Sequence, residues 1–420
     1  MKIAVFSPWP PLRSGIADYN ADLVRTLRTL GVAVDVFVPP GYSPDEQAST
    51  PEGPGEVCSH NLCTAERMAG YDAILYHMGN NATYHEYMVG TLAAFPGIVV
   101  FHDYSVHNLM AALTVDRNLN DDYLRNLERQ YGLTAAYRAL LAMLGRTNKL
   151  LWDEPLQYPA NALVLEHATA VITHSEFVAD LVRKNGFVKP VFVVPHYAKK
   201  PDDVVGEDHL REQIGLSEQE LVLASFGFMT RAKQIEGVLT TLRLMDSELR
   251  NSGISWRYLI VGEVAEDYPL RALVADLHLE ERVVFTDYVD MAAFNRYLQI
   301  TDVCINLRYP TYGESSGTLA RMLGMGKAVI VSRIGSFAEF PDGVVHKVPI
   351  NDAGHVELQQ ALRKLLFDSS YRVQLGARAA EFAEAELGIV KAAKGYIEAI
   401  DQCEGLTDIT LSMAGLIETI

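Results

Sequence analysis

Short apolar runs alternate with longer stretches of helical periodicity along almost the whole chain. The apolar runs are rich in Val, Ile and Phe, which is typical of buried strands. In the first half of the chain they lie at 2–7, 32–38, 73–78, 97–103, 170–175 and 191–196. Helical patterns such as 18–29 and 177–184 lie between several of these runs. Strands that are apolar on both faces and separated by helices predict a parallel sheet covered by helices on both sides.

The same pattern restarts after a polar segment. Residues 198–213 are charged and contain Pro and Asp, so we interpret them as a linker. The next predicted strands are 221–227, 256–262, 282–288, 302–308 and 327–332, with helices such as 236–246 and 316–324 after most of them and a helical region at 355–400. We therefore expect an α/β protein with two Rossmann-like, doubly wound domains that face a central cleft. The expected boundaries are 1–200, 201–385 and a set of C-terminal helices, 386–420, that packs back toward the first domain.

Composition and charge exclude several classes of protein. The 420 residues include 36 basic and 53 acidic side chains, a net charge of −17, which disfavours non-specific binding to nucleic acid. No apolar run approaches the roughly 20 residues that span a bilayer. The run at 2–7 is too short for the core of a signal peptide, which predicts a cytoplasmic protein. Cys58, His60 and Cys63 lack a matching second pair of ligands, so no metal site is predicted.

The most informative loop spans residues 308–318, which follow a predicted strand and open a helix. In open α/β sheets, ligands bind beyond the carboxyl ends of the strands. Ser315 or Ser316 can cap the helix, and Gly317 lets the backbone approach an anion closely. Free N–H groups at a helix N-terminus suit a diphosphate. Glu314 would then face a sugar, and the alternative is a capped helix with an exposed acid.

Two other loops carry polar side chains at strand ends. Arg231 and Lys233 follow Gly227 and can supply positive charge for a phosphate, although a solvated pair explains this segment equally well. Residues 10–17 allow a ligand to approach backbone amides but lack the G-x-G-x-x-G spacing, which disfavours a nicotinamide enzyme. Three histidines also follow successive strands, where they would line one crevice: His102, His174 and His196.

Five segments, in this order and spacing, resemble a retaining GT-B glycosyltransferase of family four (group 1 type). They are the start of the chain, FHD at 101–103, ITHSEFV at 172–178, SFGFMTRAKQIEGVL at 225–239 and GESSGTLARMLGMGKAVIVSRIGSFAEF at 313–340. The resemblance covers roughly residues 1–385. It implies that the C-terminal domain binds a nucleotide-sugar, that the N-terminal domain binds the acceptor, and that the reaction needs neither a metal nor a cofactor.

The resemblance also implies roles for individual residues. Lys233 would hold the donor diphosphate, Glu314 resembles the first acid of the E-x7-E motif, and His102 would touch the transferred sugar; these three are the implied catalytic residues. The implied donor-binding set is Gly15, Arg231, Lys233, Gly262, Tyr288, Val289, Glu314, Ser315, Ser316, Gly317, Thr318 and Arg321. Candidates for acceptor binding are Arg13, His174 and His196.

The sequence departs from the family at the ribose-binding acid. Arg321 occupies the position of the second acid of the motif, and Phe228 stands where the family often has Arg. A simple alternative is that Glu314 and Arg321, seven residues apart and near one helix face, form an ion pair.

The function that the resemblance implies is transfer of a hexose, with retained configuration, from a nucleotide diphosphate sugar to a glycan or lipid-linked acceptor in polysaccharide biosynthesis. UDP-glucose is the expected donor by its frequency in the family. A nucleotide-sugar epimerase on the same fold and a non-catalytic binding protein are the alternatives.

Residues 123–152 differ in charge from the rest of the acidic chain. Against Glu128 alone they carry five basic residues, namely Arg125, Arg129, Arg138, Arg146 and Lys149. Such a region can make a peripheral membrane contact or meet a lipid-linked diphosphate. The alternative is a core helix with a solvated basic face.

Overall fold

The computed structural model describes residues 1–39, 41–42, 53–199, 207–217, 219–351 and 354–417, with the backbone alone described at 207–209 and 404–417. The chain forms two compact units. The first comprises Met1–Pro195, Tyr312–Ser315 and Ile389–Ile420, and the second comprises His196–Thr311 and Ser316–Gly388. The described part of the chain contains no helix with the length and apolar character that crossing a membrane requires.

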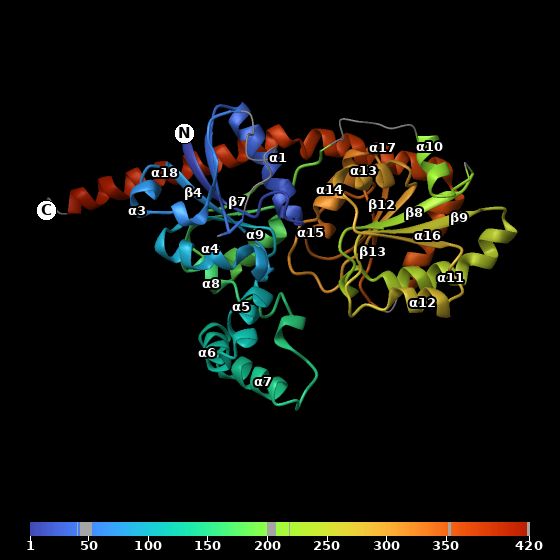
Figure 1. Cartoon of the computed structure of the whole chain (residues 1–420), viewed down its shortest axis with the longest axis horizontal. Coiled ribbons are helices and arrows are strands. Elements are labelled where there is room, and N and C mark those ends of the chain that lie inside the picture. Colours follow the sequence, from blue (N-terminus) through green and yellow to red (C-terminus); the bar gives the residue numbers. More distant parts are fainter. Residues whose placement is uncertain (40, 43–52, 200–206, 218, 352–353, 418–420) are drawn as a thin grey trace. The chain divides into compact units, whose positions relative to one another are not determined.

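The first unit is built on a parallel sheet with the strand order β3-β2-β1-β4-β5-β6-β7. Its strands are β1 (Lys2–Phe6), β2 (Ala33–Val38), β3 (Val57–Ser59), β4 (Ala73–Met78), β5 (Gly97–Phe101), β6 (Ala168–Thr173) and β7 (Val191–Val193). The helices are α1 (Gly15–Thr29), α3 (Ala65–Met68), α4 (Ala82–Ala94), α5 (His107–Thr114), α6 (Asn120–Tyr131), α7 (Leu133–Met143), α8 (Ala162–Leu165), α9 (Glu176–Lys184) and α18 (Ile389–Ile417) (Figure 1).

The second unit repeats this arrangement with the strand order β10-β9-β8-β11-β12-β13. Its strands are β8 (Leu221–Phe226), β9 (Trp256–Val261), β10 (Val283–Asp287), β11 (Val303–Asn306), β12 (Ala328–Ser332) and β13 (His346–Val348). The helices are α10 (Glu207–Gln213), α11 (Ile235–Asn251), α12 (Leu270–Asp276), α13 (Met291–Gln299), α14 (Gly317–Gly324), α15 (Gly335–Ala338), α16 (Gly354–Phe367) and α17 (Ser369–Glu386). The order reverses between β8 and β11, and between β1 and β4 in the first unit.

Local sequence explains where the helices begin. Ser14, Ser175 and Ser316 precede α1, α9 and α14, and each serine hydroxyl accepts a hydrogen bond from a backbone N–H of the first turn. Such caps satisfy donors that a helix leaves unpaired at its start. These three helices follow β1, β6 and the loop after β11, so the caps place helix N-termini at the carboxyl ends of strands.

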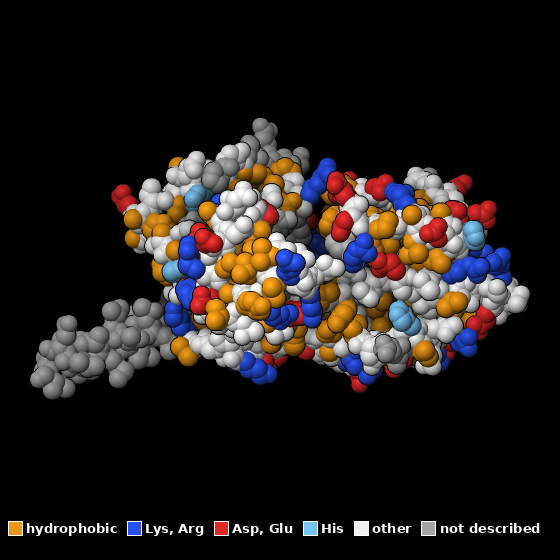
Figure 2. Space-filling model, turned by 90° about the horizontal axis from the view of Figure 1, so that it is seen from below, with side chains coloured by type: hydrophobic (Ala, Val, Ile, Leu, Met, Phe, Trp, Pro, Cys, Tyr) orange, Lys and Arg blue, Asp and Glu red, His pale blue; other side chains and the backbone are white. Residues whose placement is uncertain are grey.

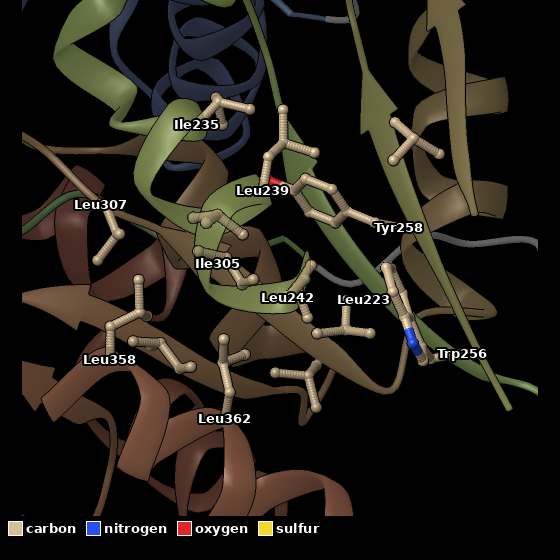
Figure 3. Packing of buried hydrophobic residues seen from close by; sticks show 14 of the residues in the cluster. Leu223, Ile235, Leu239, Leu242, Trp256, Tyr258, Ile305, Leu307, Leu358 and Leu362 are labelled. Carbon is tan, nitrogen blue, oxygen red and sulfur yellow. The ribbon is translucent and has the colours of Figure 1, made fainter. Parts of the chain in front are cut away.

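One hydrophobic cluster of the second unit lies on the face of the sheet that α11, α12 and α16 cover (Figure 3). Trp256 and Tyr258 project from β9 and are fully buried. Leu239 and Leu242 of α11 also belong to this cluster, as do residues of α12 and α16. Because each large apolar side chain contributes about 1.5–3 kcal/mol when buried, this packing holds the sheet edge that carries the loops rigidly in place.

The predicted parallel sheets and their alternating helices are confirmed. The sequence patterns missed β3 and β13, which have three residues each and end one edge of their sheets. Part of the predicted linker is wrong, because Glu207–Gln213 is helical; residues 200–206 lie outside the described residues. One short stretch of the expected second domain, Tyr312–Ser315, belongs to the first unit, where Ser105 N donates to Tyr312 O over 3.0 Å.

Candidate functional site

A buried lysine lies at the point where the strand order of the second unit reverses. Lys233 ends a 3₁₀ turn, Arg231–Lys233, that follows β8, and only 7% of its surface is exposed. Its ammonium donates a hydrogen bond to Phe226 O, the last carbonyl of β8. Tyr309 N, from the loop after β11, donates to Ala232 O over 2.8 Å. Two loops on either side of the switch point therefore support this cation. The switch point is the place where doubly wound sheets bind ligands.

The lysine converges with a helix hydroxyl on the backbone of Gly227. A Cβ atom built on Gly227 would lie 3.3 Å from Lys233 Nζ and 3.7 Å from Thr318 Oγ1. Gly227 also has a φ of +90°, which side chains of L-residues rarely allow. An ammonium, a hydroxyl and a backbone without a side chain therefore meet at one point of the second unit, an arrangement suited to an anionic ligand.

The loop after β9 closes against the same glycine. Gly262 has a φ of +129°, and a Cβ atom there would lie 2.4 Å from Gly227 O. Gly227 N donates to Val261 O over 2.9 Å, and Gly262 N donates to Thr286 Oγ1 over 3.2 Å. Past β10, Tyr288 is half exposed, whereas Val289 packs against the hydrophobic cluster on one face of the sheet.

The N-terminus of α14 carries four of the predicted site residues. Ser316 Oγ accepts a hydrogen bond from Leu319 N over 3.1 Å, so Ser316 is the cap. A Cβ atom on Gly317 would lie 2.9 Å from His196 Nε2, which places this histidine directly against the start of the helix. Thr318 follows, and the positive end of the helix dipole favours a negative charge at this point.

Glu314 and Arg321 do not form the ion pair considered above. Glu314 Oε2 accepts a hydrogen bond from Tyr312 N over 2.7 Å within its own loop. Arg321 makes no ion pair with any residue that the structure describes. Ser315 Oγ is buried without a hydrogen-bond partner among the described residues.

Arg231 differs from Lys233 in its environment. Its side chain is 61% exposed, and Nη1 lies 3.5 Å from Glu236 Oε1. Nη2 donates to Asp267 O over 2.9 Å, and the guanidinium stacks over the ring of Tyr268. Arg231 is therefore a surface side chain held by Glu236, Asp267 and Tyr268. Lys233 is the buried cation of the pair.

In the first unit, three histidines and two tyrosines form a buried ring cluster. His77 Nδ1 lies 3.0 Å from His102 Nε2, and the rings of His102 and His174 are 4.9 Å apart. The ring of Tyr19 contacts all three, and its hydroxyl lies 3.0 Å from that of Tyr396 in α18. Since His102 and His174 follow β5 and β6, the structure brings together two of the three histidines predicted at strand ends; His196 lies in the second unit.

Burial keeps His77, His174 and Tyr19 of this cluster uncharged at neutral pH. Loss of hydration lowers the pKa of His77 far below its usual value and lowers that of His174 to about 4. Burial also raises the pKa of Tyr19. The sequence patterns missed His77, Tyr19 and Tyr396; His77 sits inside an apolar strand, where a polar residue is itself a signal.

The remaining predicted residues lie at the start of α1. Gly15 opens the helix, and nothing lies within 4 Å of a Cβ atom built on it. The carbonyl of Arg13 accepts a hydrogen bond from Tyr84 over 3.3 Å. Across the described residues, no three His, Cys, Asp or Glu side chains gather as a metal site would require. Cys58 and His60 instead contact Val36 O and Thr91 Oγ1.

Comparison with protein families gives a match within the second unit. Residues 221–368 match the family model described as glycosyl transferases group 1. The match includes β8 to β13, and therefore Lys233, Gly262 and the start of α14. No curated protein sequence matches the chain. The second unit thus contains the segment that is similar to group 1 glycosyltransferases.

Comparison with solved structures extends the likeness in fold to the whole chain. Sucrose-phosphate synthase from Thermosynechococcus elongatus is 18% identical, with 99% of this chain and 100% of that chain covered and a TM-score of 0.63. HepE from Anabaena in complex with UDP-glucose is 16% identical, with coverage of 96% and 100% and a TM-score of 0.64. WaaG, a glycosyltransferase involved in lipopolysaccharide biosynthesis, is 12% identical, with coverage of 94% and 99% and a TM-score of 0.61. The chain has the GT-B fold, as its sequence predicts.

Proposed function

We propose that this protein is a retaining glycosyltransferase that transfers a hexose from UDP-glucose to a glycan or lipid-linked sugar. We place the reaction in the cytoplasm and in polysaccharide biosynthesis, and we expect it to need no metal or cofactor. The observation that carries the proposal is the convergence of Lys233 Nζ and Thr318 Oγ1 on the bare backbone of Gly227.

This arrangement suits the departure of a nucleoside diphosphate. Cleavage of the bond between the sugar and the diphosphate leaves negative charge on the phosphate oxygens. The Lys233 ammonium, the Thr318 hydroxyl and the first amides of α14 are donors fixed in advance of the reaction, so they would stabilise that charge without reorganising. Because attack on the same face of the sugar needs no protein nucleophile, the leaving phosphate itself would accept the proton of the acceptor hydroxyl.

Two solved structures of one relative in fold are consistent with this choice of donor. HepE of Anabaena has been crystallised with UDP-glucose and with UDP and glucose, and its chain is covered completely by the likeness. Sequence identity this low supports a shared fold and nothing more. The proposed specificity for uridine and glucose therefore rests on the sequence resemblance. The roles of His102 toward the sugar and of Gly15 toward the diphosphate stay predictions from that resemblance.

A thermal-shift screen tests the donor. We expect UDP and UDP-glucose to raise the melting temperature, whereas uridine, which lacks the phosphates, raises it little. A ligand present at 100 times its Kd adds about 2.7 kcal/mol to the free energy of unfolding. If ADP, GDP or CDP stabilises the protein and UDP does not, the uridine assignment is wrong.

Product analysis separates transfer from the two alternatives. Incubation with UDP-glucose and a mixture of sugar acceptors should release UDP and add one hexose mass to an acceptor. An epimerase would convert the donor sugar without any acceptor, and a non-catalytic binding protein would be stabilised by the donor without releasing UDP. Either result would exclude glycosyl transfer.

A further inference from the structure

Helix α7 has an unusual distribution of large and small apolar residues. It buries only alanines, namely Ala135, Ala136 and Ala139. Apart from the half-buried Leu141, its bulky apolar side chains and that of the C-cap residue Leu144 face outward, and the exposed fractions are 72% for Leu133, 58% for Tyr137, 39% for Leu140, 36% for Met143 and 63% for Leu144. An ordinary surface helix turns its large apolar residues to the core. In α7 the small alanines face the core and the large apolar residues face solvent.

The outward residues form one continuous stripe. Leu133, Tyr137, Leu140 and Leu144 follow one another at intervals of four, three and four residues, which places them on one face of a helix. At 1.5 Å per residue, the stripe is about 16 Å long. Figure 2, which views the molecule from the side of α6 and α7, shows hydrophobic side chains gathered over this part of the first unit, with both basic and acidic side chains around them.

The stripe lies in a stretch of sequence that contains no acidic residue. From Arg129 to Trp152 the chain contains no Asp or Glu, although its net charge is −17. Arg146, directly after the stripe, is exposed and makes no ion pair with any described residue. Arg138 and Lys149 pair with Glu154, beyond the acid-free stretch. The stripe itself therefore carries no acid, and Arg146 at its C-terminal end is a cation without an ion pair among the described residues, whereas Arg129, Arg138 and Lys149 pair with acids from outside the stretch.

We propose that the α7 stripe docks on an anionic lipid surface. Exposed leucines and a tyrosine on one helix face, with basic residues beside them, are the features by which helices lie in the interface of a membrane. The eleven residues of α7 are too few to cross the hydrocarbon core, so the helix lies on the surface. A second copy of the chain is the other possible occupant, and the experiment below distinguishes it from a lipid surface.

Vesicle co-sedimentation of the full chain tests the proposal. Vesicles of phosphatidylcholine with about 30% phosphatidylglycerol should bind the protein, vesicles of phosphatidylcholine alone should bind it much less, and about 0.5 M salt should weaken the binding to anionic vesicles. Leu144→Glu should lower the partition coefficient about tenfold or more. Arg146→Gln should weaken binding to anionic vesicles only.

A leucine on another helix provides the matched control. Leu244 in α11 is 73% exposed, comparable with Leu144, but belongs to the second unit. Leu244→Glu adds the same charge and should leave vesicle binding unchanged, and equal melting temperatures would show that both variants fold. Absence of binding to anionic vesicles at low salt, or equal loss in both variants, would overturn the proposal. So would self-association in ultracentrifugation that Leu144→Glu abolishes, because the stripe would then join two copies. None of these outcomes depends on transferase activity.

Discussion

His77 Nδ1 and His102 Nε2 lie 3.0 Å apart inside the first unit, between a strand interior and the loop that follows the next strand. One nitrogen must donate and the other accept, so the contact fixes the tautomer of His102 relative to that of His77. His77→Phe keeps the volume of a ring but removes the partner of a buried nitrogen. We expect it to lower the free energy of unfolding by about 1–3 kcal/mol in urea denaturation.

His77→Asn is the comparison for that variant. The amide nitrogen of Asn can occupy the place of Nδ1, so the asparagine variant should recover part of the loss despite its smaller size. If His77→Phe is at least as stable as both the wild type and His77→Asn, the contact does not stabilise the fold.

The buried histidines make stability depend on pH. The unfolded chain protonates His174 near pH 6.5, but burial lowers the folded pKa to about 4. As the pH falls from 7 toward 4, the unfolded state takes up a proton that the folded state does not, so the folded state loses stability. We expect His174 to account for a loss of about 2 kcal/mol between pH 7 and pH 5. Urea unfolding at the two pH values measures this loss.

A variant isolates the contribution of His174 from that of other titrating groups. His174→Asn should remove about 2 kcal/mol from the difference between pH 7 and pH 5. His355→Gln, which changes an exposed histidine of α16, should leave the difference as it is in the wild type. An unchanged difference in His174→Asn would contradict the lowered pKa.

Alanine substitutions at two glycines with positive φ allow the cost of backbone strain to be compared with the cost of a steric clash. Gly253 has a φ of +71° and open space around a Cβ atom, whereas Gly262 has a φ of +129° and a Cβ atom there would overlap Gly227 O. We expect Gly253→Ala to cost about 1–2 kcal/mol through strain alone. Gly262→Ala should cost about 1–3 kcal/mol more, because the β8 and β9 loops must separate. Calorimetric melting of the two variants gives the comparison, and equal losses would mean that the loops are not in close contact.

The sequence predicted the fold well because buried parallel strands leave a strong local pattern. Runs such as 221–227 and 327–332 are apolar throughout, and the structure places β8 and β12 within them. The edge strands β3 and β13 have too few residues for a pattern to develop. Helix α10 lies in a stretch whose Pro, Asp and Lys residues mask it. The placement of Tyr312–Ser315 in the first unit depends on contacts with Tyr104 and Ser105, which no local pattern encodes.

Residues of the candidate site could be predicted only where a side chain that can bind an anion also lies directly after a predicted strand. Lys233 and Thr318 each lie in a short motif that follows a predicted strand. Their position after a strand was therefore enough to identify them as candidate site residues. The sequence could not distinguish Lys233, which is buried, from Arg231, which is exposed, because that difference comes from tertiary neighbours. Tyr19 and Tyr396 are 377 residues apart and meet only through the return of α18 to α1.

Lys233 provides the decisive test of the anion site. Lys233→Met removes the ammonium from its position over Gly227 and keeps most of the apolar stem. Since hydrogen bonds to charged groups contribute about 1.5–3 kcal/mol, we expect UDP to bind about 10- to 100-fold more weakly by calorimetry, with uridine binding unchanged. Turnover should fall about 10²- to 10³-fold, the usual effect of removing one such donor.

Lys327 is the matched control, because its ammonium also donates to a backbone carbonyl, that of Gln299, over 2.6 Å in the same unit. Lys327→Met should lose stability in the way that Lys233→Met does, since each leaves a carbonyl without its donor, but it should bind UDP normally. A Lys233→Met protein that is folded and binds UDP as tightly as the Lys327→Met protein would place the diphosphate elsewhere. The convergence on Gly227 would then be a feature of packing rather than of a donor site.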